Sequence, residues 1–301
     1  MSFELFFGEN DEPLLTGRPF GIMGILNLTP DSFYDGGRSA DATEHAARLL
    51  AEGADIIDLG GESTRPGASP VSPREEANRI LAPLRRIRSA LPTAIISVDT
   101  RRAETAVLAL DEGAILVNDI SGLRDPDMAD VLTEYRPIYC LTHNPGLFGC
   151  QRETRDDIVL ETRRFFEEKI GELIARGFPE DHIMLDCGIG FGKSFEDNLA
   201  LISRMGEFLD LGRPMLAAVS MKSFFGKLLN LGIDERAGAT ATVSALLRRE
   251  GVFWHRAHDV ASVRDALILA AALESGKVPV DKGAGLKYNL KSGARETTGL
   301  D

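Results

Sequence analysis

The sequence predicts one α/β domain, a (β/α)8 barrel with its active site at the carboxyl ends of the strands. Two observations predict this fold. Short, nearly continuous apolar runs, typical of strands covered on both faces, alternate with helical segments eight times along the 301 residues. Almost every run ends in a polar or charged residue, and in a barrel these ends open on one face. A doubly wound open sheet competes with the barrel, because periodicity alone does not separate the two.

Eight strands are expected, each about as long as a buried strand of a parallel sheet. In chain order they are Phe20–Asn27, Asp55–Gly60, Ala94–Asp99, Ile115–Asp119, Ile138–His143, Ile183–Asp186, Met215–Ser220 and Val252–His258. A polar cap at any single strand end has an ordinary explanation, namely solvation at the surface. The whole set of polar ends is better explained by convergence on one mouth.

Helices are expected between the strands. Gly53 ends the first one, and Ser72-Pro73-Arg74-Glu75 begins the second with a capping box and a proline in the first turn. Pro83 is expected to kink or divide this second helix. The sequence predicts the first and last residues of the other helices, which are Thr43–Glu52, Arg101–Glu112, Asp127–Tyr135, Asp157–Arg176, Phe195–Leu209, Thr240–Glu250 and Ser262–Glu274.

Composition limits the classes of function and location. The chain divides into an N-terminal extension (1–18), the barrel (19–276) and a polar C-terminal tail (277–301). A net charge of −12 argues against nucleic-acid binding. No apolar run approaches the roughly 18 residues of a membrane span, and Glu4 and Glu9 lie where a signal peptide needs positive charge. The cysteines, Cys140, Cys150 and Cys187, have no metal-site spacing and form no even disulfide set, which indicates the cytoplasm.

Two loops after the first two strands carry candidate anion and metal chemistry. In the second loop, Thr64 and Arg65 place a hydroxyl beside a five-donor guanidinium, which suits a phosphate group. In the first loop, Asn27, Asp31 and Asp35 supply the hard oxygen ligands that a diphosphate-bound Mg²⁺ prefers.

These loops resemble the signature segments of the dihydropteroate synthase family, and the similarity covers roughly residues 19 to 273. Several long motifs occur in the family's order. They are 27–37, 60–67, Ser97-Val98-Asp99-Thr100, 117–122, 186–193, Ser220-Met221-Lys222-Ser223 and 256–260. The resemblance implies a (β/α)8 barrel that joins 4-aminobenzoate to a dihydropterin methyl diphosphate and releases pyrophosphate. It also implies a homodimer.

Each family role falls on residues of this chain. Asp99, Asn118, Asp186 and Lys222 are the expected pterin-binding residues. Asp99 could instead cap the next helix, and Asn118 and Asp186 could simply solvate strand ends. The expected catalytic residues are Asp99, Lys222, Arg256 and His258. The resemblance further assigns the diphosphate to Asn27, Thr64, Arg65, Arg256 and His258, and the aminobenzoate to Pro66, Met221 and Ser223. The Mg²⁺ ligands remain Asn27, Asp31 and Asp35.

Three departures from the family pattern keep alternatives open. Cys187 replaces a usual proline, Met221 a usual arginine, and Thr142-His143-Asn144-Pro145 a usual Met-His-Met. They motivate a non-catalytic pterin-binding paralogue as the main alternative. A related pterin-binding methyltransferase would lack the Ser-Thr-Arg-Pro-Gly loop. Residues 187–194 also come within one residue of a nucleotide-binding phosphate loop, with cysteine at its first glycine.

Overall fold

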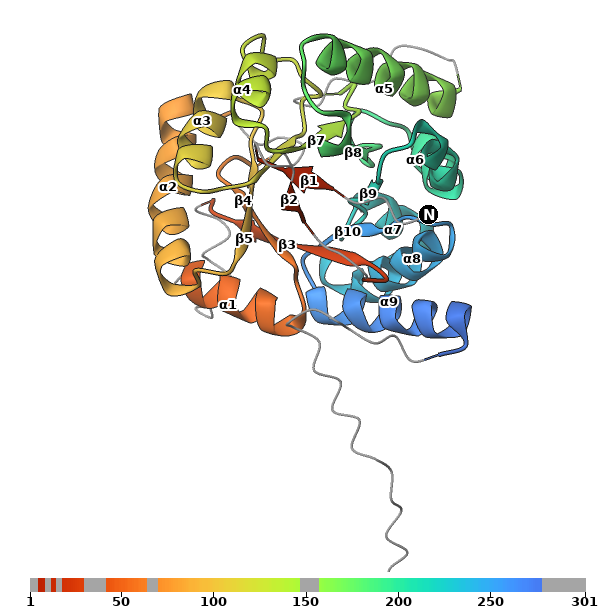
Figure 1. Ribbon diagram of the computed structural model, residues 1–301. Coiled ribbons are helices and arrows are strands. Elements are labelled where there is room, and N and C mark those ends of the chain that lie inside the picture. Colours follow the sequence, from red (N-terminus) through yellow and green to blue (C-terminus); the bar gives the residue numbers. More distant parts are fainter. Residues whose placement is uncertain are drawn as a thin grey trace, which may run out of the picture.

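Eight parallel strands form the ring that the sequence predicts. The computed structural model describes residues 5–8, 12–14, 18–29, 42–63, 70–146 and 157–277. The sheet order is β8-β7-β6-β5-β4-β3-β10-β9, and a parallel bridge between Leu185 and Met215 joins the outer members β8 and β9. The ring of strands is surrounded by helices (Figure 1). The barrel strands are β3 (Gly21–Asn27), β4 (Ile56–Gly60), β5 (Ile95–Asp99), β6 (Leu116–Asp119), β7 (Ile138–Thr142), β8 (Ile183–Asp186), β9 (Leu216–Ala217) and β10 (Trp254–Ala257).

Helices follow the strands around the outside. They are α1 (Ala42–Glu52), α2 (Pro73–Ala90), α3 (Ala103–Asp111), α4 (Met128–Tyr135), α5 (Ile158–Ala175), α6 (Phe195–Ser203), α7 (Ser223–Leu229), α8 (Ala237–Arg249) and α9 (Val260–Ser275). Short 3-10 helices lie at η3 (Glu180–His182), η4 (Met205–Leu211) and η5 (Ile233–Glu235). No helix among the described residues is long and apolar enough to cross a membrane.

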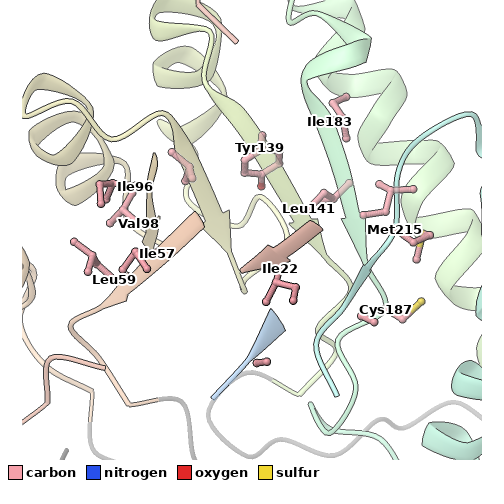
Figure 2. Packing of buried hydrophobic residues seen from close by; sticks show 14 of the residues in the cluster. Ile22, Ile57, Leu59, Ile96, Val98, Tyr139, Leu141, Ile183, Cys187 and Met215 are labelled. Carbon is pink, nitrogen blue, oxygen red and sulfur yellow. The ribbon is translucent and has the colours of Figure 1, made fainter. Parts of the chain in front are cut away.

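The main core lies between the strands and the helices. Neighbouring strands pair in register, so that Ile57 lies beside Ile96 and Leu59 beside Val98. Figure 2 shows these four side chains gathered together, and all belong to one cluster of buried apolar residues. Since alternate residues of a strand face opposite sides, the intervening positions face the inside of the barrel.

A second apolar cluster closes the amino-terminal end of the barrel. Strands β1 (Phe6–Phe7) and β2 (Glu12–Pro13) form an antiparallel pair, which lies across the centre of the ring in Figure 1. The flanking residues Leu5 and Leu14 are buried against interior side chains that include Met23, Ile56 and Trp254. This hairpin of the N-terminal extension therefore fills one end of the barrel and leaves the opposite end for chemistry.

Local signals fixed most element boundaries, with a few differences. The Ser72 hydroxyl accepts from the Glu75 amide at 3.2 Å, as expected, while the Glu75 carboxylate accepts from Arg79. The expected division at Pro83 is wrong: α2 continues through it, because its buried face extends on both sides of the proline. The α6 helix ends before the expected Leu209 and gives way to η4. The helix α7 lies in a region for which only the helix Thr240–Glu250 was expected. The C-terminal tail beyond residue 277 lies outside the described residues.

Candidate active site

A fully buried carboxylate, Asp58, organises the polar interior near the carboxyl ends of the strands. Its oxygens accept from the Ser97 hydroxyl at 2.6 Å, the Asn118 amide nitrogen at 2.9 Å and the Arg256 Nε at 2.7 Å. Asn118 lies on β6 and Arg256 on β10, whereas β5 and β3 are the sheet neighbours of β4. These bonds therefore cross the inside of the barrel and link four strands.

Arg256 bridges two carboxylates inside this interior. Its Nη2 donates to Asp99 Oδ2 at 2.7 Å, in addition to the bond from Nε to Asp58. Burial works to lower the pKa of Arg256, but the two carboxylates outweigh it and raise the pKa. Burial, partly opposed by Arg256, raises the pKa of Asp99 to about 7. The alternative role of Asp99 as a helix cap is wrong, because Arg102 occupies the cap position of α3.

Asn118 at the carboxyl end of β6 and Asp186 at the carboxyl end of β8 are buried and carry hydrogen-bond acceptors. The Asn118 amide is oriented by its donation to Asp58, and its Oδ1 atom is buried without a partner in the described structure. One Asp186 oxygen accepts from the Gly188 amide at 2.8 Å. Burial raises the pKa of Asp186, although Gly188 and Lys222 oppose the shift. A buried acceptor left unpaired costs stability, so the oriented Asn118 oxygen indicates a ligand that donates.

Lys222 approaches the same acceptors from the end of the seventh barrel strand. Its ammonium lies 4.5 Å from the centre of the Phe191 ring, a cation–π arrangement. A Cβ on Gly190 would come within 3.3 Å of the lysine Cδ, so this glycine keeps room for the lysine stem. Burial lowers the pKa of Lys222 to about 8, while Asp186 opposes the shift.

His258 and Ser220 meet at the rim. The Ser220 hydroxyl lies 2.9 Å from His258 Nδ1 and accepts from the His258 backbone amide at 3.1 Å. His258 is exposed, whereas His255 on the opposite side of the strand is buried. Met221 and Lys222 are half-buried, and Ser223, the first residue of α7, is exposed. The last strand thus points Arg256 inward and leaves His258 at the mouth.

The phosphate-loop alternative is contradicted by Lys193. Its ammonium donates to the carbonyl oxygens of His143 at 2.8 Å and Gly188 at 2.9 Å, and lies 3.4 Å from that of Phe191. Burial lowers its pKa to about 7. The lysine therefore fastens a turn and does not face a phosphate. Cys187 is buried in the outer core, as Figure 2 shows, and burial raises the pKa of its thiol.

Several predicted site residues lie outside the described part of the chain. They are Asp31, Asp35, Thr64, Arg65 and Pro66. The described ends of the second loop are tied together, because Glu62 accepts from the Val71 amide at 3.0 Å and from Arg102 at 2.8 Å.

Of the three expected Mg²⁺ ligands, Asn27 alone lies among the described residues. Asn27 ends β3, and its Oδ1 and Asp99 Oδ2 both lie beside Gly60, at 3.6 and 3.8 Å from where a Cβ would be. Amide and carboxylate oxygens are suitable ligands for Mg²⁺. No cluster of three or more metal-binding His, Cys, Asp or Glu side chains occurs among the described residues.

Asp58 and Ser97 belong to the hydrogen-bonded interior of the candidate site, although the sequence had not indicated a role for either. The available signal was a single carboxylate within the apolar strand Ile56–Gly60, since a buried charge requires partners. The predicted site residues were those at the ends of strands, whereas Asp58 lies in the middle of its strand.

Comparisons with known proteins agree with this geometry. Residues 23–258 match the family described as "Pterin binding enzyme". The dihydropteroate synthase of Bacillus subtilis is 41% identical over 262 residues, which cover 85% of this chain and 90% of that protein. The structure of Xanthomonas albilineans dihydropteroate synthase with 4-aminobenzoic acid matches with a TM-score of 0.83 and 35% identity, over 91% of this chain and 99% of the other.

A second solved structure carries a pterin. The dihydropteroate synthase of Anaplasma phagocytophilum with bound 6-hydroxymethylpterin-monophosphate matches with a TM-score of 0.77 and 33% identity, over 85% of this chain and 99% of the other. The barrel, its polar interior and these extensive similarities together lead to one assignment: the chain belongs to the dihydropteroate synthase family of pterin-binding enzymes.

Proposed function

We propose that this protein is a dihydropteroate synthase, a transferase that condenses 6-hydroxymethyl-7,8-dihydropterin diphosphate with 4-aminobenzoate. The observation that carries the proposal is the buried, unpaired Oδ1 of Asn118, to which the Asp186 carboxylate adds a second buried acceptor at the same end of the barrel. A pterin ring offers a row of N–H donors to such acceptors, and charge-assisted bonds to Asp186 strengthen the fit. No observation favours the non-catalytic alternative.

The reaction requires positioning and stabilisation of the leaving group. The 4-aminobenzoate nitrogen forms a bond to the pterin methylene carbon, the C–O bond breaks with its electron pair going to pyrophosphate, and the amine loses one proton. Arg256 and His258 would bind the leaving diphosphate, and Lys222 would lie near the pterin ring; the presence of Arg256 in the polar interior and of His258 at the mouth supports these roles. Preorganised cations of this kind lower the barrier as charge develops.

No covalent enzyme intermediate is required. Both described cysteines, Cys140 and Cys187, are buried, and burial raises the pKa of each thiol, so neither supplies a thiolate. Mg²⁺, held by Asn27 together with Asp31 and Asp35, would neutralise part of the diphosphate charge. Thr64 and Arg65 would bind the same group, while Pro66, Met221 and Ser223 would contact the aminobenzoate.

Oligomeric state and location belong to the same proposal. Two neighbouring helices, α8 and α9, carry exposed leucines, namely Leu246, Leu269 and Leu273. Exposed apolar side chains of this kind favour a homodimer through these helices. The protein is proposed to act in the cytoplasm. Light scattering of the purified chain would give a monomer mass if the dimer is wrong.

The test of the activity is pyrophosphate release with both substrates, with each substrate omitted in turn, and with Mg²⁺ removed by a chelator. Release should require both substrates and fall when the metal is removed. Asp186→Asn should lose activity, whereas Asp181→Asn, which changes an exposed carboxylate, should not. Binding of a pterin without any pyrophosphate release would establish the non-catalytic alternative.

A further inference from the structure

The backbone of Met221 adopts the left-handed conformation, with φ +58. Residues with a side chain rarely take this conformation, because the Cβ atom crowds the following carbonyl group. Leu123, Arg136 and Asn230 also have positive φ, and the last two end helices, where the conformation is common. Met221 ends no helix. It lies between Ser220 and Lys222, two residues of the candidate active site.

Both backbone polar atoms of Met221 are held by the start of α8. The Met221 amide donates to Thr240 Oγ1 at 3.1 Å, and Arg236 Nη1 donates to the Met221 carbonyl oxygen at 3.1 Å. Thr240 is 3% exposed, and its hydroxyl donates to the Arg236 carbonyl oxygen at 2.9 Å. The two partners are thus bonded to each other as well as to residue 221.

The path of the Arg236 side chain depends on a glycine. A Cβ on Gly226 would lie 2.6 Å from Arg236 Nη2 and 2.9 Å from the Leu231 carbonyl oxygen. Both distances are too short for real contacts, so any side chain at position 226 would displace the guanidinium. The hydrogen bond from Arg236 to the Met221 carbonyl oxygen therefore depends on Gly226 of α7 as well as on the start of α8.

The conformation of residue 221 sets the direction of its two neighbours. Lys222 places its ammonium 4.5 Å from the Phe191 ring centre, and Ser220 places its hydroxyl 2.9 Å from His258 Nδ1. A change of φ at residue 221 from the left-handed to the right-handed region would turn these side chains relative to each other. A displacement of about 1 Å at a reacting group can reduce a rate by about 100-fold.

We infer that Thr240 and Arg236 are positioning residues, which hold Met221 in the left-handed conformation and so aim Lys222 and Ser220 into the active site. The inference rests on the proposed function where activity is the readout. Its geometry also gives a readout that does not depend on activity, namely the protection of the Met221 amide.

The decisive experiment combines Thr240→Val with Met221→Gly. Valine keeps the shape of threonine but cannot accept a hydrogen bond from the Met221 amide. Glycine adopts positive φ without a steric cost. Thr240→Val should lower kcat/KM at least about tenfold in the natural background and less than about threefold when residue 221 is glycine. Two independent structural defects would instead multiply, because distant or unlinked effects add in free energy.

The conservative variant and hydrogen exchange complete the test. Thr240→Ser keeps the hydroxyl and should remain within about threefold of the natural enzyme. The Met221 amide should exchange slowly in the natural protein and in Thr240→Ser, and at least about tenfold faster in Thr240→Val. If Thr240→Val does not fold, Arg236→Met supports the same comparison, because methionine keeps an unbranched stem and cannot donate to the Met221 carbonyl oxygen.

The outcomes separate the two proposals. Absence of pyrophosphate release from the natural enzyme would overturn the proposed function, and the exchange data would still report on Met221. Equal losses in the methionine and glycine backgrounds, or unchanged protection of the amide in Thr240→Val, would overturn the positioning role.

Discussion

Replacement of Asp58 by asparagine should reduce both stability and pterin affinity, because this carboxylate is the common partner of three donors. Asparagine has nearly the same shape, but it loses the charge and turns an NH₂ group toward groups that also donate. Only one of the two acceptor oxygens would remain, so the bond from Ser97 to Oδ1 and the bonds from Asn118 and Arg256 to Oδ2 could not all be kept.

The size of the stability loss follows from burial. Asp58 is 0% exposed, and breaking a buried ion pair typically costs about 3–5 kcal/mol. Arg256 keeps its bond to Asp99, which favours the lower end of that range, while the bonds from Ser97 and Asn118 to the charged carboxylate, each typically worth about 1.5–3 kcal/mol, act in the other direction. The free energy of unfolding should therefore fall by about 3–5 kcal/mol, as measured by urea unfolding followed by far-UV circular dichroism.

A double variant tests whether the cause is the unpaired charge. Arg256→Met alone leaves Asp58 buried without its cation, so it should also be costly. The double variant Asp58→Asn/Arg256→Met contains neither charge, and its loss should be smaller than the sum of the two single losses by about 2–3 kcal/mol. Ser97→Ala removes one hydrogen bond to the carboxylate and no charge, so it should cost about 1.5–3 kcal/mol.

Pterin binding gives a second measurement on the same variants. The bond to Asp58 leaves the Asn118 Oδ1 atom as the end of the amide that faces a ligand. Without that bond the amide can turn, and pterin affinity should fall about tenfold, equivalent to about 1.4 kcal/mol. Additive stability losses, or a loss below about 1 kcal/mol for Asp58→Asn with unchanged pterin affinity, would refute the reasoning.

The remaining predictions concern the titration, the pterin carboxylate and the aminobenzoate side. The kcat/KM should rise as the pH increases through about 7, since Asp99 must ionise to pair with Arg256, and it should fall as the pH increases through about 8, where Lys222 loses its proton. In Asp99→Asn the rise near pH 7 should disappear. Asp186→Asn should weaken pterin binding by about 1.5–3 kcal/mol in titration calorimetry while leaving the fold intact, and unchanged affinity would place the pterin elsewhere. Met221→Arg should lower the KM for 4-aminobenzoate about two- to fivefold, which corresponds to the free energy of a partly exposed charge pair, and the gain should be smaller at high salt. If Met221→Arg instead creates activity where the natural protein has none, the non-catalytic alternative is supported.

The architecture could be predicted from the sequence because it depends on local and periodic signals. Apolar runs of strand length, separated by helices, require a parallel sheet covered on both faces. Polar residues at the ends of those runs, among them Asp99, Asn118, Asp186 and Arg256, must meet on one face of a barrel. The sequence alone therefore indicated that these four residues lie at the same end of the barrel.

The partnerships within that mouth were decided only by the tertiary structure. Asp58, Asn118 and Arg256 lie on strands that are not neighbours in the sheet, so their contact depends on the closure and register of the ring. Lys193 was a candidate phosphate ligand by sequence, yet three carbonyl oxygens surround its ammonium.

Backbone conformation and long-range burial were also beyond local signals. The left-handed φ of Met221 is stabilised by Arg236 and Thr240, which follow it by 15 and 19 residues. Leu5 and Leu14 are buried at the amino-terminal end of the barrel, where they contact apolar side chains that only the ring of strands brings together. The residue pattern along the chain thus determined the ring and the face that carries the chemistry. Contacts between distant segments determined each partner, because such contacts exist only once the ring has closed.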